Sequence, residues 1–382
     1  MAVRREPADR SGVTVLQTRG SPVSKPSIAS TLAVAVFALG LLAPALASAQ
    51  TAAPAAAFTD STAAGLSGTR RVAISAVVVS FQGSVAGERL AGSGMFADKS
   101  SARAVLALPD MDAALQARIA DEAYRQLKAQ LTAAGYEVVP EAEVKASATY
   151  GEIIKLAGLP NYTRFGNALG DMTLVSAAGL TPYLPYSVEG SLFEQPKSYI
   201  GWMSGMGGKS ITPGGPSVVS IGTTWKLPGL EVKLAKELNA NVVKAFYVVN
   251  LGEAFADRKR ELGARIVTTG EGSASAQLSL VADQTRIAFR TPTGNPKWQK
   301  VAFTKPAPAK DGDVVVRLAA PMVSDGDFFS VTGTSRLGGI FAPGADFQFN
   351  FTAHLTDENA YGVAVDGMIA SATTAMVGLV KP

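Results

Sequence analysis

The chain has 382 residues, 47% of them hydrophobic and 17% charged, so it is long enough to bury a sizeable core in one large domain or two smaller ones. It contains no cysteine, which excludes disulfides, thiol catalysis, cysteine zinc sites and lipidation of an amino-terminal cysteine. Its formal net charge is +4, and the distribution of that charge decides whether it bears on function.

Residues 1–49 have the pattern of a secretory signal peptide. Five basic residues precede an apolar run over 28–46, and Ala47-Ser48-Ala49 offers a small-x-small cleavage site. We therefore expect an exported protein that is cleaved before Gln50. An uncleaved membrane anchor is the alternative.

The basic charge belongs mostly to this amino-terminal segment. Residues 1–49 hold five of the 35 Lys and Arg and two of the 31 Asp and Glu, which leaves 30 against 29 in the remainder. No basic stripe remains to neutralise phosphates, so we expect no nucleic-acid partner. We expect a periplasmic or outer-membrane-associated location.

The first part of the mature chain predicts a lead and then a buried strand. Residues 50–70 are rich in Ala, Thr, Ser and Pro and are expected to be flexible, before a domain over 71–382. The nearly continuous apolar run Val72–Phe81 is typical of a strand covered on both faces. The glycine-rich stretch Gly83–Ser101 is expected to be a loop.

The stretch from Asp110 to Val139 predicts a helix and a second strand. Asp110 or Asp112 can cap the helix, whose apolar positions recur every four residues. Gly135 suits the left-handed conformation that ends a helix, and Tyr136–Val139 then returns as a strand. Together with the strand before it, this makes a β-α-β unit. A further helix is expected over Glu141–Leu156.

A Gly-, Pro- and aromatic-rich insertion is expected over 158–228. One reading of this stretch is an insertion with short strands of its own, or a surface that contacts a partner or, through 199–222, a membrane. The other reading is an irregular but buried excursion that completes the core. On the first reading, the candidate interaction residues are Tyr199, Trp202, Met203, Met206 and Trp225.

The rest of the chain predicts a short helix, further strands and a closing helix. The helix covers Glu231–Ala240, and the last helix covers Asn359–Leu379 after Asp357-Glu358. The strands are expected at 242–251, within 265–290, and at 298–303, 314–318, 328–332 and 347–355. The predicted class is α/β of mixed α+β type: a β-α-β core sheet with a large insertion, antiparallel strands and a C-terminal helix.

This order of elements resembles the amino-terminal domain of TolB and the related curli-channel family. The matching pieces are Val72–Phe81, Leu127–Val139 and Leu234–Val243, about a third of the mature chain. The resemblance implies an envelope α/β module that oligomerises or binds other proteins. It carries over no site residue. Two features depart from the family, the missing lipidation cysteine and the long connection over 158–228.

The sequence contains few residues or motifs that could carry catalysis. His354 is the one histidine and alternates with strand residues, which favours a structural role. Gly208-Lys209-Ser210 lacks the first glycine of a phosphate loop, because position 203 is Met. Asp311-Gly312-Asp313 lacks the calcium-loop pattern. We therefore predict no catalytic residue, no metal ligand and no cofactor.

The function predicted from these features is a non-enzymatic binding or assembly module of the cell envelope, able to form homo-oligomers. Its partners would be envelope proteins or further copies of itself. One alternative is a hydrolase of envelope polymers that uses two carboxylates. Its candidates are Asp325, Asp327, Asp357 and Glu358, which are read first as turn and cap residues. The other alternative is an outer-membrane pore subunit whose insertion crosses the bilayer.

Overall fold

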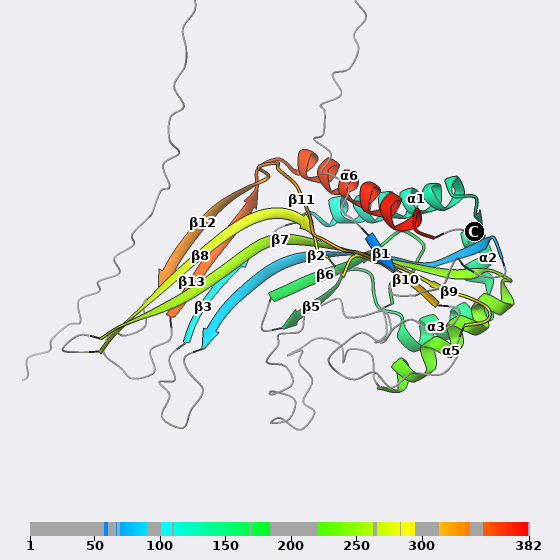
Figure 1. Cartoon of the computed structure of the whole chain (residues 1–382), viewed down its shortest axis with the longest axis horizontal. Coiled ribbons are helices and arrows are strands. Elements are labelled where there is room, and N and C mark those ends of the chain that lie inside the picture. Colours follow the sequence, from blue (N-terminus) through cyan, green and yellow to red (C-terminus); the bar gives the residue numbers. More distant parts are fainter. Residues whose placement is uncertain are drawn as a thin grey trace, which may run out of the picture. The chain divides into compact units, whose positions relative to one another are not determined.

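Two long strands, β2 (Arg71–Leu90) and β7 (Asn241–Leu262), lie in parallel at the centre of the computed structural model (Figure 1). The structure describes residues 57–59, 66, 69–90, 101–108, 111–167, 170–183, 221–262, 266–282, 284–294, 313–336 and 347–380. All of them belong to one unit, Ala49–Pro382. The predicted signal peptide lies outside the described residues.

The strands form one mixed sheet of thirteen, in the order β1-β10-β9-β7-β2-β3-β13-β12 with side branches. The main path comprises β1 (Ala57–Thr59), β10 (Asp313–Leu318), β9 (Arg286–Arg290), β7, β2, β3 (Ser101–Ala107), β13 (Phe347–Leu355) and β12 (Phe329–Arg336). The branches are β4 (Glu137–Val138), β5 (Thr163–Asn167), β6 (Gly170–Ser176), β8 (Ile266–Leu280) and β11 (Met322–Val323). The predicted mixed α/β class with a C-terminal helix is confirmed.

The β-α-β unit is present as expected. Helix α1 (Ala113–Ala133) begins after Asp112, whose carboxylate accepts a hydrogen bond from the Ala114 N–H at 2.9 Å. Gly135 has a φ of 92°, which glycine adopts without the steric cost that a side chain would add. The chain then pairs through β4 in parallel with the start of β2, so both strands share one sheet.

Helices cover both faces of this central part of the sheet (Figure 1). Helices α1 and α6 (Glu358–Val377) lie on one face. Helices α2 (Glu141–Ala146), α3 (Ala148–Ala157) and α5 (Ile221–Glu237) lie on the other. Because β2 and β7 are buried on both sides, their apolar residues run on without alternation.

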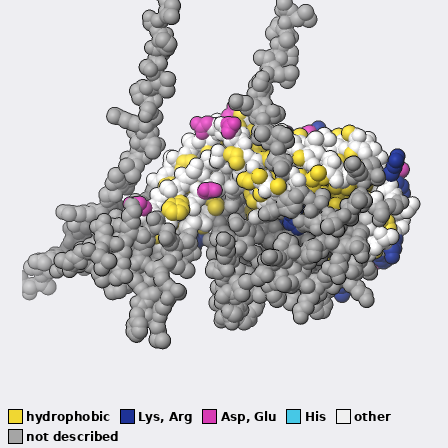
Figure 2. Space-filling view, in the orientation of Figure 1, with side chains coloured by type: hydrophobic (Ala, Val, Ile, Leu, Met, Phe, Trp, Pro, Cys, Tyr) yellow, Lys and Arg dark blue, Asp and Glu magenta, His cyan; other side chains and the backbone are white. Residues whose placement is uncertain are grey.

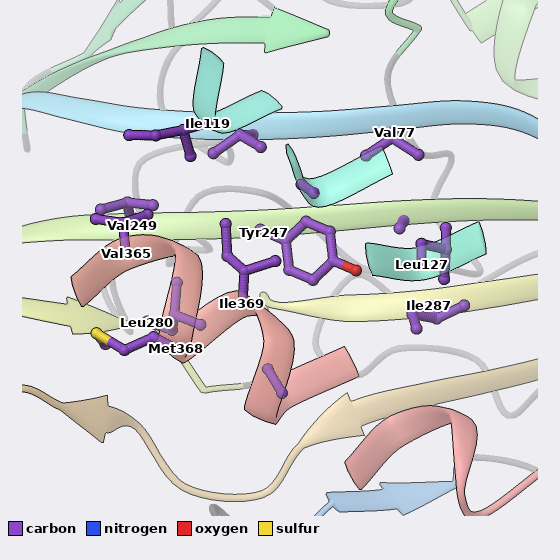
Figure 3. Packing of buried hydrophobic residues seen from close by; sticks show 14 of the residues in the cluster. Val77, Ile119, Leu127, Tyr247, Val249, Leu280, Ile287, Val365, Met368 and Ile369 are labelled. Carbon is purple, nitrogen blue, oxygen red and sulfur yellow. The ribbon is translucent and has the colours of Figure 1, made fainter. Parts of the chain in front are cut away.

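The larger core lies between the sheet and the α1–α6 pair, as Figure 3 shows around Tyr247. Tyr247 of β7 is fully buried, and its hydroxyl lies 2.7 Å from the Thr373 hydroxyl of α6. Ile119 and Leu127 of α1 and Ile369 of α6 pack into the same cluster. Burial of these side chains fixes both helices on the sheet.

Several predicted boundaries were wrong. Strand β2 continues through Leu90, where a loop was expected, because residues 84–90 pair with β3. Within the lead expected to be flexible, Ala57–Thr59 pair with β10. The helix expected over 141–156 is two helices, because Ser147 is extended and caps α3. The strand expected at 298–303 lies outside the described residues.

The two ends of the predicted insertion belong to the core. Strand β6 pairs with β2, and Leu174 and Tyr183 are buried. The other end enters α5 at Ile221, and Leu227 is buried. The buried reading therefore holds for 170–176, for Tyr183 and for Leu227. Residues 184–220 lie outside the described part of the chain.

Among the described helices, α6 is the one long and apolar enough to cross a membrane by length and composition. It is half buried within the protein, and the Asp357 side chain caps its amino-terminal end. These contacts are those of a core helix.

Candidate functional site

The described structure does not test the predicted interaction residues. Tyr199, Trp202, Met203 and Met206 lie outside the described residues, as does Gly208-Lys209-Ser210. Trp225 falls in the backbone of α5, and its side chain is not described. The segment 199–222 ends inside this helix, since Ile221 and Gly222 already belong to α5.

The carboxylates of the hydrolase alternative fall on two neighbouring loops. The Asp357 carboxylate accepts the Ala360 N–H at 2.9 Å and caps α6, as predicted, and Glu358 is the first residue of that helix. Asp325 and Asp327 are exposed between β11 and β12. Within the ranges that the structure describes, no group of three or more His, Asp or Glu residues could hold a metal ion.

His354 is exposed on β13, opposite Ser330 of β12. On β12, Ser330 lies directly opposite His354, and Thr332, two residues further along that strand, also carries a hydroxyl. A histidine base needs a nucleophile and an orienting partner, and no described hydrogen bond or ion pair joins His354 to a carboxylate.

A buried charge cluster, which sequence reasoning missed, joins α5 to the sheet. Glu231 of α5 is fully buried, and its Oε1 lies 2.6 Å from Nζ of the equally buried Lys244 on β7. Arg290 of β9 is also buried, with its Nε 3.6 Å from the other oxygen, Oε2. A buried carboxylate that contacts two cations avoids the large cost of an isolated interior charge.

Tyr183, which follows strand β6 in the chain, also contacts this cluster. Lys244 Nζ lies 5.5 Å from the ring centroid of Tyr183, a cation–π contact. The Tyr183 hydroxyl is 2.6 Å from the Ser75 hydroxyl of β2, so the tyrosine bridges the cation and the central strand. Tyr183 is the last described residue before 184–220, and Glu231 lies within α5, the helix that follows that segment.

Two more buried arginines flank the cluster on the same face. Arg286 of β9 stands in register with Arg317 of β10, and its guanidinium lies 5.1 Å from the ring of Phe246. The sequence signal was the presence of charged residues within apolar strands, namely Arg286 and Arg290 in RIAFR and Lys244 in VVKAFYVV. In a strand covered on both faces, a charged side chain is buried and therefore needs a polar or charged partner.

The chemistry of the cluster is that of a structural anchor. Catalysis needs reacting atoms within reach of a substrate, and Glu231, Lys244, Ser75 and Tyr183 have no exposed surface. Their contacts hold α5 and Tyr183 on the sheet.

The second candidate site is a strand extension, in which the sheet runs on past the helices (Figure 1). We define it as residues 84–90 of β2, residues 252–262 of β7, and strands β3, β8, β12 and β13. After Val249 the chain of β7 leaves β2 and pairs with β8 alone, while β3 takes its place beside β2. The β7–β8 ribbon then packs against the sheet β2-β3-β13-β12.

Small side chains and a few phenylalanines fill the space between the two layers. The buried members are Ala102, Ala104, Ala256, Phe347 and Phe349. Gly272 of β8 lies against the Phe349 ring, and an added Cβ there would stand 2.6 Å from Phe349 Cβ. The layers are therefore close, and the interior has no room for a ligand between these residues.

The outside of the strand extension is mostly polar. Along β7 and β8 the exposed positions include Glu253, Ser273, Ser275 and Gln277, and they alternate with partly buried Ala and Gly. Phe255, with 57% of its surface exposed, and Val331, with 39%, are exceptions. In Figure 2 the visible described part of this surface is mostly white, the colour of the backbone and of side chains that are neither hydrophobic nor charged, with groups of hydrophobic side chains between. Long sheet edges present backbone groups with which a strand of another chain can pair.

No family model, curated protein or solved structure matches this chain. The resemblance to TolB and the curli-channel family thus remains a prediction.

Proposed function

We propose that this chain is an exported, non-enzymatic assembly module of the cell envelope, which binds other proteins through its strand extension. The observation that carries the proposal is the division of the sheet into two parts. The helix-covered part buries its charged groups, and the strand extension exposes long strands with polar faces. Export is supported by the basic and apolar pattern of residues 1–49, which ends in a small-x-small cleavage site.

The length of the central strands supports this division of the sheet into a helix-covered part and a strand extension. A strand of 22 residues such as β7 spans roughly 70 Å at 3.3 Å per residue, well beyond what a 20-residue helix of about 30 Å can cover. The helices stabilise one end of β2 and β7, so the other end can project without its own helical layer. Such a projection offers backbone groups to a partner strand.

The experiment is site-specific photo-crosslinking in intact cells. A crosslinking residue at Phe255, on the exposed face of β7, should capture a defined partner. The matched position is Lys233, which is exposed on α5 and lies on the helix-covered part. Capture from Phe255 and not from Lys233 supports the proposal. Equal capture at both positions, or none from the strand extension, contradicts it.

The hydrolase alternative makes a separate prediction. Replacement of Asp325 and Asp327 by Asn would abolish hydrolysis of an envelope polymer if these carboxylates were catalytic. We expect crosslinking from Phe255 to be unchanged in that variant, because both residues lie on an exposed loop outside the strand extension.

A further inference from the structure

The terminal strand of the main sheet, β12, has an edge that faces away from β13. β12 pairs with β13 along its whole length, from Phe329 opposite Leu355 to Arg336 opposite Gln348. Among the described strands, β13 is the one that pairs with it. The outer backbone groups of β12 therefore form a template on which a further strand can add.

Along β12 itself, the sequence and the register with β13 lack most of the features by which proteins usually protect such strands. Charged side chains, proline and bulges normally discourage pairing with another chain. The sequence of β12 is FSVTGTSR, in which Arg336 at the end is the one charged residue, and its register with β13 is unbroken. Ser330, Val331 and Thr332 are all exposed. By contrast, β7 carries five successive charged residues near its end, Asp257 to Glu261.

We propose that β12 pairs antiparallel with β12 of a second copy of this chain. The inference rests on the proposed assembly function and names its partner. A two-fold axis at Thr332 sets Thr332 opposite itself, Val331 opposite Gly333, and Ser330 opposite Thr334. All these residues are small or β-branched and uncharged, so no like charges meet.

The two-fold geometry also matches the faces of the sheet. In an antiparallel pair, residues directly opposite share one face, so a two-fold axis through Thr332 joins like faces of the two copies. The strands β2-β3-β13-β12 would continue into the same four strands of the partner copy. A contact of this kind is closed, because each copy uses its one β12 edge.

Charge substitutions at the two-fold position test the pairing in the full chain. Thr332→Lys and Thr332→Glu should each weaken dimerisation by at least about tenfold in sedimentation velocity, because two like charges would face each other. An equal mixture of the two variants should recover dimers. Asn350→Lys, exposed on the next strand, is the matched control and should dimerise as the unmodified chain does.

The absence of cysteine allows a second measurement that does not depend on charge. Thr332→Cys should form a disulfide-linked dimer under mild oxidation, since opposite residues in a paired strand bring their Cβ atoms close. Asn350→Cys should remain monomeric on a non-reducing gel.

Three results would overturn the inference. The first is an unmodified chain that is monomeric at about 100 μM, a concentration well above the Kd of a stable interface. The others are Lys and Glu variants that dimerise as the unmodified chain does, and a mixture of the two variants that stays monomeric. If the chain is monomeric but Phe255 still captures another envelope protein, the assembly function stands and only the self-pairing of β12 fails.

Discussion

Gly87 of β2 lies directly against the backbone of Ala254 of β7, where the two layers of the strand extension meet. A Cβ added to Gly87 would overlap the Ala254 carbonyl oxygen and stand 2.9 Å from its carbonyl carbon. Backbone atoms cannot move aside as a flexible side chain can. The approach of the layers therefore depends on glycine at this position.

Gly87→Ala should loosen the strand extension. We expect a cost of about 1–3 kcal/mol in the free energy of unfolding, because overpacked sites force backbone shifts. Amide hydrogen exchange should show the loss of protection in residues 84–90 and 252–258, with little change in α1 and α6.

Gly151→Ala is the matched control. A Cβ at Gly151 of α3 would meet no atom within 4 Å, so the added methyl has space. Alanine is favoured over glycine in a helix, and this variant should gain about 0.5–1 kcal/mol in urea unfolding. Equal effects at Gly87 and Gly151 would contradict the close approach.

Sequence patterns were sufficient for the presence of the β-α-β core and for both ends of its helix. The Asp112 cap, the four-residue apolar period of α1 and the left-handed Gly135 are local signals, and the structure has all three. The apolar run in β2 predicted burial on both faces because parallel strands carry helices on both sides.

The strand extension could not be predicted in the same way. Residues 84–90 contain glycine and charged positions, and Gly87 among them lies against the backbone of the other layer. Such composition is typical of a loop, and pairing with β3 is decided by tertiary contacts. The charge cluster was missed for a related reason, since Glu231 and Lys244 are separated in sequence and only the fold makes them partners.

Removal of either partner of the Glu231–Lys244 pair should destabilise the fold strongly. Lys244→Met leaves a buried carboxylate with one fewer cation, and we expect a loss of about 3–5 kcal/mol in urea unfolding. Lys233→Met breaks the exposed pair with Glu152 and should cost less than about 1 kcal/mol. A similar loss in both variants would show that burial does not set the value of the Lys244 contact.

The hydroxyls of two buried tyrosines should have opposite effects on stability. Thr373 donates to the Ile369 carbonyl at 2.7 Å, so the Tyr247 hydroxyl at 2.7 Å donates to Thr373. Tyr247→Phe loses this bond and should cost about 1 kcal/mol. The hydroxyl of Tyr136 is buried without a hydrogen-bond partner among the described residues, and burial raises its pKa to about 12.

Tyr136→Phe should therefore be neutral or stabilising by up to about 1 kcal/mol, because it removes a buried polar group that gains no bond. Both variants keep the ring and its packing, so the comparison isolates the hydroxyl. Urea unfolding of the two variants under one condition checks the order. Tyr136→Phe at a cost equal to that of Tyr247→Phe would contradict it.

Stability should depend on pH through Asp366, at the contact between α1 and α6. Its Oδ2 accepts a hydrogen bond from Arg118 Nη1 at 2.6 Å. Burial raises the pKa of the Asp366 carboxyl above its ordinary value, Arg118 opposes this rise, and the charge of Glu122 adds to it. The folded-state pKa thus exceeds that of the unfolded chain, and protonation of Asp366 stabilises the folded state.

This stabilisation is complete at pH values below the unfolded-state pKa and is lost as the pH rises through the folded-state pKa. Asp366→Asn stays neutral throughout. Its free energy of unfolding relative to the unmodified chain should therefore increase between about pH 3 and pH 7. Arg118→Met removes the opposing cation and should raise the pKa of Asp366 further, which moves the loss to higher pH. Denaturant unfolding of all three proteins across this pH range measures the free energies of unfolding. If the difference between Asp366→Asn and the unmodified chain does not change with pH, Asp366 has the same pKa in the folded and unfolded states and the prediction is wrong.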